Sequence, residues 1–164
     1  MMRRNPRSDA RATLKQASTC ARLAGSETVE AEHILLALSG HRGTVAYAVL
    51  SEAGLNAERI SEALAVEQAA SLASVGVTAL TPPMATYLPE SRQLGESARL
   101  AITRGAAAAR ARRERRMSST HLLIGVLAAD VGRVPRALAH VGVDRGRLLA
   151  ECHAALDSFL RRAS

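Results

Sequence analysis

Two short stretches of the sequence each begin with a polar residue and a histidine and continue with aliphatic residues. They cover residues 32–38, starting at Glu32-His33, and residues 120–126, starting at Thr120-His121. The acid at the start of the first stretch, Glu32, would suit the positive end of a helix dipole.

The spacing of the histidines and cysteines does not match that of a metal site, a catalytic arrangement or a disulfide. His33 and His121 have no Cys, His or Asp neighbour at metal-ligand spacing, so we predict packed, hydrogen-bonded histidines and no metal site. No Ser-His-Asp or Cys-His arrangement recurs at matching positions, and we therefore expect neither catalytic residues nor a cofactor. Cys20 and Cys152 fall at helical core positions, which favours small buried hydrophobic residues over a disulfide.

The two histidine stretches belong to a longer internal repeat. Placing His33 on His121 sets an offset of 88 residues (121 − 33), and no gap is needed within either copy. A repeat of this kind constrains the whole fold. The pairs that match under this offset are Ala10 with Ala98, Leu14 with Ile102, Ala21 with Ala109, Leu50 with Leu138, Gly54 with Gly142 and Ile60 with Leu148.

The spacing of apolar residues predicts four helices in each copy and therefore an all-α fold of eight helices in two pseudo-twofold related repeats. Glycines end the expected helices, and Asn56, Ser118 and Asp144 are plausible helix N-caps. We expect a loose N-terminus at residues 1–7, a first repeat at 8–68 and a linker at 69–93, where Ser, Gly, Thr and three prolines interrupt the period. A second repeat at 94–160 and a C-terminal tail at 161–164 complete the chain. Leu35, Leu38, Leu50, Leu123 and Leu138 are predicted to lie in the core.

The composition agrees with packed helices and limits the classes of function. Hydrophobic residues make up 48% of the 164 residues and aromatic residues only 2%, which favours helices over sheet. No apolar run is long enough to span a membrane, and the basic start is not followed by the apolar stretch of a signal peptide, so we expect a cytoplasmic protein. The net charge of +7 would attract acidic partners and, without specificity, nucleic acid.

The first repeat resembles the Clp N-terminal domain, most closely that of the ClpC type. The residues that carry the resemblance are Ala21-Arg22-Leu23, the stretch 32–38, residues 46–50 and Gly54-Leu55. The resemblance extends from about residue 8 to residue 159 and implies a pseudo-twofold, eight-helix domain that docks substrates and adaptors without hydrolysing ATP. The sequence contains no Gly-x-x-x-x-Gly-Lys-Ser/Thr loop and ends where an ATPase ring module would begin, so we expect a free-standing domain.

The ClpC-type resemblance also implies a possible phosphoarginine site in each repeat, with the glutamate of the Glu-His pair binding the guanidinium. Glu32 matches this position in the first repeat, with Arg7 or Arg11 as the base that would face the phosphate. A carboxylate pairs with a guanidinium through two parallel hydrogen bonds, but Glu32 could equally be an acid at a helix start, and both roles stay open. Thr120 replaces the glutamate in the second repeat, and the Phe-Thr that tends to begin each repeat reads Pro6-Arg7 and Leu94-Gly95 here. We therefore predict at most one such site.

Two further groups of residues are candidates for contacts. Tyr87, Leu94 and Arg99 are predicted peptide contacts. Five arginines around the predicted end of the fifth helix could contact phosphates or could form a solvated helix end. These are Arg110, Arg112, Arg113, Arg115 and Arg116.

The predicted function is a non-enzymatic module that binds Clp ATPase or protease components, substrates, adaptors or peptide-like ligands. A nucleic-acid-associated protein with an arginine-rich face is the alternative, and scarce aromatic residues make it the less favoured one.

Overall fold

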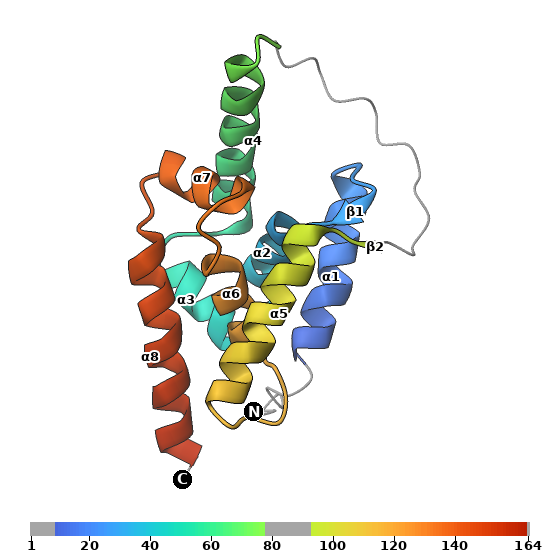
Figure 1. Cartoon of the computed structure of the whole chain (residues 1–164). Helices are drawn as coiled ribbons and strands as arrows, with labels where there is room; N and C mark the ends of the chain where they lie inside the picture. Colours follow the sequence, from blue (N-terminus) through green and yellow to red (C-terminus); the bar gives the residue numbers. More distant parts are fainter. Residues whose placement is uncertain (1–8, 78–92, 164) are drawn as a thin grey trace.

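The computed structural model describes residues 9–77 and 93–163, which form eight helices and one short parallel ladder of two strands (Figure 1). The all-α fold of eight helices is therefore confirmed. The helices are α1 (Asp9–Leu23), α2 (Ala31–Gly40), α3 (Val45–Glu52), α4 (Ala57–Ser74), α5 (Glu96–Ala111), α6 (Ser119–Leu127), α7 (Arg133–His140) and α8 (Arg145–Ala163), and the strands are β1 (Thr28–Val29) and β2 (Gln93–Leu94).

Equivalent residues of the two repeats cap equivalent helices. The side chains of Asn56 and Asp144, which are 88 residues apart (144 − 56), accept hydrogen bonds from the third amide of α4 and of α8, at 2.8 and 3.0 Å. These bonds satisfy amides that a helix start leaves without a partner. The sequence predicted both caps.

Hydrogen bonds between the repeats follow the same offset. The Asp9 carboxylate accepts from the Ser119 amide at 2.9 Å, and Ser97 Oγ accepts from the Ala31 amide at 2.9 Å. Asp9 corresponds to Ser97 and Ala31 to Ser119 under the 88-residue offset. Each repeat thus begins with a side chain that caps the central helix of the other repeat.

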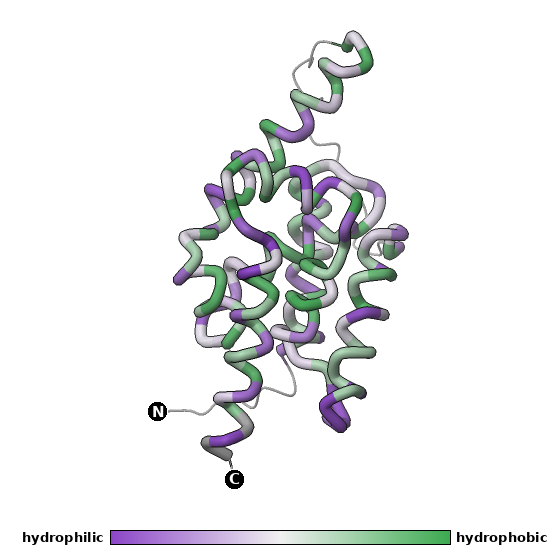
Figure 2. The backbone as a smooth tube through the Cα atoms, turned by 60° about the vertical axis from the view of Figure 1, so that its left-hand side comes forward, coloured by the Kyte–Doolittle hydropathy of each residue, from purple (hydrophilic) through white to green (hydrophobic). Residues whose placement is uncertain are grey.

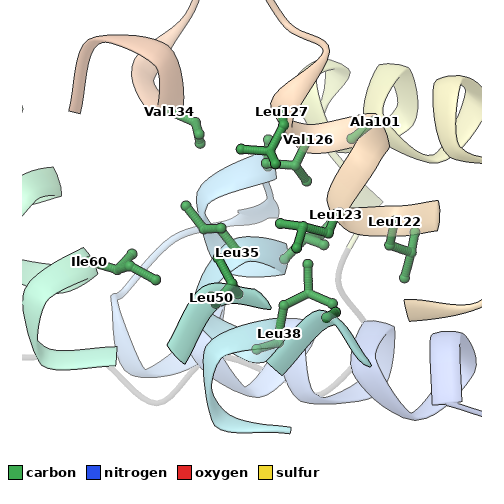
Figure 3. Close-up of a cluster of buried hydrophobic side chains, with 14 of the residues drawn as sticks. Leu35, Leu38, Leu50, Ile60, Ala101, Leu122, Leu123, Val126, Leu127 and Val134 are labelled. Carbon is green, nitrogen blue, oxygen red and sulfur yellow. The ribbon is translucent and has the colours of Figure 1, made fainter. Parts of the chain in front are cut away.

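The core lies around α2 and α6, the two helices that begin with the histidine stretches. All nine residues of α6 are buried. Leu35, Leu38, Leu50, Leu123 and Leu138 are each at most 1% exposed, as predicted. Figure 3 shows Leu35 and Leu38 of α2 gathered with Leu123 and Val126 of α6, so the leucines of both repeats share one core.

Two glycines allow α5 and α6 to pack closely. A Cβ atom added to Gly125 would lie 1.9 Å from the carbonyl oxygen of Ala101, and one added to Gly105 would lie 2.6 Å from that of His121. Both distances are far below van der Waals contact, so only glycine fits at these positions. The first repeat has Ala37 and Ala17 in the equivalent places, and its α1 and α2 tolerate the extra methyl groups.

The ladder of β1 and β2 joins the repeats and was not predicted. Thr28 pairs with Gln93 and Val29 with Leu94 in parallel register, and the Gly95 amide donates to the Val29 carbonyl at 2.9 Å. The ladder places the end of α1 next to the beginning of α5.

The ends of two helices differ from the predicted boundaries. Helix α4 continues to Ser74 and α8 to Ala163, so they include residues that the sequence placed in the linker and the tail. Residues 69–74 contain only Ala, Ser and Leu, and the first breaker after them is Gly76, which has a φ of +75°. The last turns of α4 rise above the rest of the molecule (Figures 1 and 2).

Candidate functional site

Glu32, the predicted guanidinium ligand, already binds a guanidinium of its own chain. Its side chain is only 10% exposed, and Oε1 accepts a hydrogen bond from Nη1 of Arg133 at 3.1 Å. Glu32 belongs to α2 of the first repeat and Arg133 to α7 of the second. Glu32 is therefore paired with a guanidinium of its own chain, and its predicted role as a ligand-binding residue stays a prediction.

Arg133 belongs to a wider group of polar side chains between α4 and α7. Its Nη2 donates to Gln68 Oε1 at 2.8 Å, and its Nε lies 3.3 Å from Glu67 Oε2 in an ion pair that lacks hydrogen-bond geometry. Arg136 Nε donates to the other oxygen of Glu67 at 2.8 Å. We call Glu32, Glu67, Gln68, Arg133 and Arg136 the inter-repeat network.

Glu67 is the most buried member of the inter-repeat network, with a side chain only 3% exposed. Burial raises the pKa of this carboxyl, but hydrogen bonds from Ser71 and Arg136 and the charges of the two arginines lower it more. The pKa of Glu67 consequently lies below its ordinary value. The network therefore contains an ionised carboxylate at neutral pH.

The structure does not bring Arg11 to Glu32. Thr13, near the beginning of α1, shares a 2.8 Å hydrogen bond with His41, directly after the end of α2. Glu32 lies at the opposite end of α2, nine residues before His41 (41 − 32), or about 13 Å along the helix. Arg7 falls outside the described residues. Thr120, the counterpart of Glu32, is buried and 2% exposed.

His33 and His121 occupy equivalent places and serve the caps of α2 and α6. The Nδ1 atom of His33 accepts from the Glu30 amide at 2.9 Å, and that of His121 accepts from the Ser118 amide at 3.1 Å. A histidine at this position does what glutamate or glutamine does in a capping box. The hydrogen-bonded structural role predicted for both histidines is confirmed.

His121 is fully buried and neutral. Burial lowers its pKa, and this outweighs the charge of Glu114, whose Oε1 lies 3.5 Å from Nε2. Over residues 9–77 and 93–163, no three His, Cys, Asp or Glu side chains are grouped as a metal site would require. Burial also raises the pKa of the Cys152 thiol to about 12, so this cysteine is an inert core residue.

The arginines at the end of α5 divide into one structural residue and four exposed ones. Arg112 forms an ion pair with Asp157 of α8 and donates to the His153 carbonyl at 3.3 Å. The hydrogen bond from Arg112 lowers the pKa of Asp157 below its ordinary value. The four exposed ones are Arg110, Arg113, Arg115 and Arg116.

The predicted peptide contacts lie on and near α5. Arg99 is exposed on α5, and Leu94 in β2 is 37% exposed. Tyr87 falls outside the described residues. Leu94 and Arg99 are thus available to a partner, on the side of the molecule that carries the ladder.

Sequence reasoning missed Arg133 and Glu67, which contact each other across 66 residues (133 − 67). Neither has a charged counterpart in the other repeat, because the offset pairs Arg133 with Val45 and Glu67 with Ala155. Glu67 did carry one signal, since it is the only charged residue from Ala63 to Pro89.

Within the described ranges, none of the helices combines the length and apolarity that a bilayer span requires. Comparison with curated protein sequences gives no match.

Solved structures match the fold over most of the chain. The N-terminal domain of the caseinolytic protease associated chaperone ClpD from Arabidopsis thaliana aligns with a TM-score of 0.66 at 16% identity, covering 88% of this chain and 90% of that one. The Hsp104 N-terminal domain from Candida albicans aligns with a TM-score of 0.62 at 11% identity, covering 88% and 86%.

A protein-family model, that of the Clp repeat (R) N-terminal domain, matches residues 6–98, which is more than half of the chain. The match covers the whole first repeat and the beginning of the second, and the structure supplies the second repeat with the same helix order and the same caps. The chain therefore belongs to the Clp repeat N-terminal domain family, a family of substrate- and adaptor-binding modules of Clp chaperones.

Proposed function

We propose that this protein is a non-enzymatic binding module of the Clp chaperone-protease system, which captures proteins or peptides as an adaptor, a substrate-capturing protein or a decoy. The observation that carries the proposal is membership of the Clp repeat family together with a complete two-repeat fold. Binding rather than catalysis also agrees with His33 and His121, which are occupied by helix caps.

Affinity capture from the cytoplasm of the source cells tests this proposal. The tagged chain is immobilised, and the retained proteins are quantified against an unrelated protein of similar size and charge. We expect enrichment of Clp ATPase or protease subunits, or of their substrates and adaptors. A retained set that consists of nucleic-acid-binding proteins and disappears after nuclease treatment would instead favour the alternative function.

A narrower proposal concerns phosphoarginine, which the ClpC-type resemblance implies at Glu32. Because Glu32 already binds Arg133, a guanidinium ligand has to displace this internal arginine. Arg133→Met would remove the competitor and is expected to tighten binding, whereas Glu32→Ala should weaken it by about tenfold or more.

Calorimetric titration with free phosphoarginine measures both effects. One site per chain is expected, and Thr120→Ala serves as the control that leaves the affinity unchanged. Two equal sites, or undiminished affinity in Glu32→Ala, would assign Glu32 to the inter-repeat network alone.

A further inference from the structure

Two groups of positive side chains in this protein have different surroundings. Arginines near α7 and α8 are neutralised by carboxylates, and these are Arg112, Arg133, Arg136, Arg145 and Arg147. Those on α1 and α5 form no ion pair with any carboxylate in the described parts of the chain. We call the second set the cationic face: Arg11, Lys15 and Arg22 of α1 and Arg99, Arg104 and Arg110 of α5.

The cationic face has almost no negative charge of its own. The carboxylates of α1 and α5 are Asp9 and Glu96, both in the first turn. Asp9 is occupied by hydrogen bonds from the amide and the hydroxyl of Ser119. From Ala10 to Leu23 and from Ser97 to Ala111 no acid follows, so the positive charges of both helices have no carboxylate partner on their own helix. Arg11, Lys15, Arg99 and Arg110 are exposed, and Arg22 and Arg104 are half-buried.

The arrangement of these cations repeats with the fold. Arg11 corresponds to Arg99 and Arg22 to Arg110 under the 88-residue offset. Both helices pack on α2 and α6, and they run in opposite directions (Figure 1). Because the ladder joins the end of α1 to the beginning of α5, Arg22 and Arg99 lie toward the ladder, and Arg11 and Arg110 lie toward the other end.

Apolar side chains are exposed on the same two helices. Leu23 follows Arg22 and is 74% exposed, and Leu100 follows Arg99 and is 42% exposed. A hollow of about 240 Å³ opens between α1 and α2. It is lined by Ala12, Gln16, Leu36, Ala37, Gly40 and His41.

We propose that the cationic face binds an acidic segment of a partner protein that also carries leucine-like side chains. Carboxylates of such a segment would pair with the guanidinium groups, and its apolar side chains would cover Leu100 and enter the hollow beside α1. The proposal rests on the proposed function, for which it specifies the surface and the chemistry of the partner.

Nucleic acid fits this surface less well than an acidic protein segment. Single strands bind to proteins through aromatic side chains that stack on the bases, and neither α1 nor α5 contains an aromatic residue. The exposed leucines and the apolar hollow would gain nothing from a phosphate backbone. The combination of unpaired cations with apolar contacts therefore selects a protein partner.

Fluorescence anisotropy with defined peptides tests the proposal. The labelled probe is a short peptide of Glu and Leu at helical spacing, and the comparison peptides replace Leu by Ser or Glu by Lys. An oligodeoxythymidine of equal charge serves as the nucleic-acid competitor. The protein should bind the Glu and Leu peptide best, and the competitor should not displace it at about 0.15 M salt.

Charge-reversal variants locate the binding surface. Arg11→Glu with Arg99→Glu changes the cationic face, and Arg147→Glu with Arg161→Glu changes exposed arginines of α8. Both pairs lower the net charge from +7 to +3 (7 − 4). We expect about tenfold weaker binding for the first pair and less than about twofold for the second, with unchanged circular dichroism for both.

The outcomes separate this inference from the proposed function. Four outcomes would each overturn the cationic face as a protein-binding surface. The two charge-reversal pairs could weaken binding equally, or the peptide of Glu and Ser could bind as tightly as the peptide of Glu and Leu. The oligonucleotide could displace the peptide, or the wild-type protein could fail to bind it. Capture of Clp components despite such a result would leave the proposed function intact. Specific peptide binding without capture of Clp components would contradict the proposed function alone.

Discussion

The inter-repeat network provides the most informative single perturbation of this structure, Arg133→Met. Methionine keeps much of the volume and apolar length of the arginine but removes its charge and its donors. Glu32 then loses its only ion-pair partner in the described parts of the chain, while Glu67 keeps Arg136 and Ser71. The substitution leaves Glu32 as a largely buried carboxylate without a cation, and it also removes the contacts of Arg133 with Gln68 and Glu67.

The magnitude follows from the exposure of the groups involved. Breaking a fully buried ion pair costs about 3–5 kcal/mol, whereas an exposed pair contributes about 0–1 kcal/mol. The side chains of Glu32 and Arg133 are 10% and 33% exposed, which places this pair between the two limits. We expect Arg133→Met to lower the free energy of unfolding by about 2 kcal/mol and the melting temperature by about 4–8 °C.

Urea denaturation followed by circular dichroism measures this change. Glu32→Gln in the Arg133→Met background removes the unpaired charge and should recover about 1 kcal/mol, so the two substitutions are not additive. Arg147→Met is the matched control, because its pair with Glu151 is 77% and 40% exposed and should contribute less than about 0.5 kcal/mol. Arg133→Met with wild-type stability, or additive effects of the two substitutions, would refute the reasoning.

Three further substitutions test other parts of the fold. Gly125→Ala should lower the free energy of unfolding by at least about 2–3 kcal/mol, because its Cβ would meet the Ala101 carbonyl. Gly40 has open space around it, so Gly40→Ala should be nearly neutral, and thermal melts compare the two variants. The lowered pKa of His121 means that the unfolded chain binds more protons below about pH 6.5, so stability falls as the pH drops from there toward the folded-state pKa. In His121→Gln, which can still cap, the loss of urea stability between about pH 7 and pH 5 should be smaller, and an identical loss would contradict this assignment. Leu35→Ala should cost about 2–5 kcal/mol, and an unchanged melting temperature would count against its place in the core.

The sequence predicted those features that repeat. Several predicted features have a counterpart at the same 88-residue offset, so each copy of the repeat supported the interpretation of the other. These are His33 and His121, the caps at Asn56 and Asp144, and the buried leucines. Residues at equivalent positions of a repeat take equivalent structural roles because the same unit is packed twice. The eight helices followed from this pattern.

The features that break the symmetry could not be predicted in this way. Arg133 and Glu67 have uncharged counterparts, and their contact depends on how α7 packs on α4, which no local pattern encodes. The two-residue strands are too short to show a period. Residues 69–74 lacked a clear apolar face because the end of α4 packs on little else, so the helix was mistaken for a linker.

Photo-crosslinking in living cells tests the central claim most directly. A photoreactive phenylalanine derivative replaces either Leu100 on the cationic face or Val131 in the turn between α6 and α7, which is 86% exposed. The proposed function and surface predict that position 100 crosslinks to a Clp component, or to a substrate or adaptor of that system, and that position 131 does not. Crosslinks to Clp-system proteins from neither position, or equally from both, would contradict the claim.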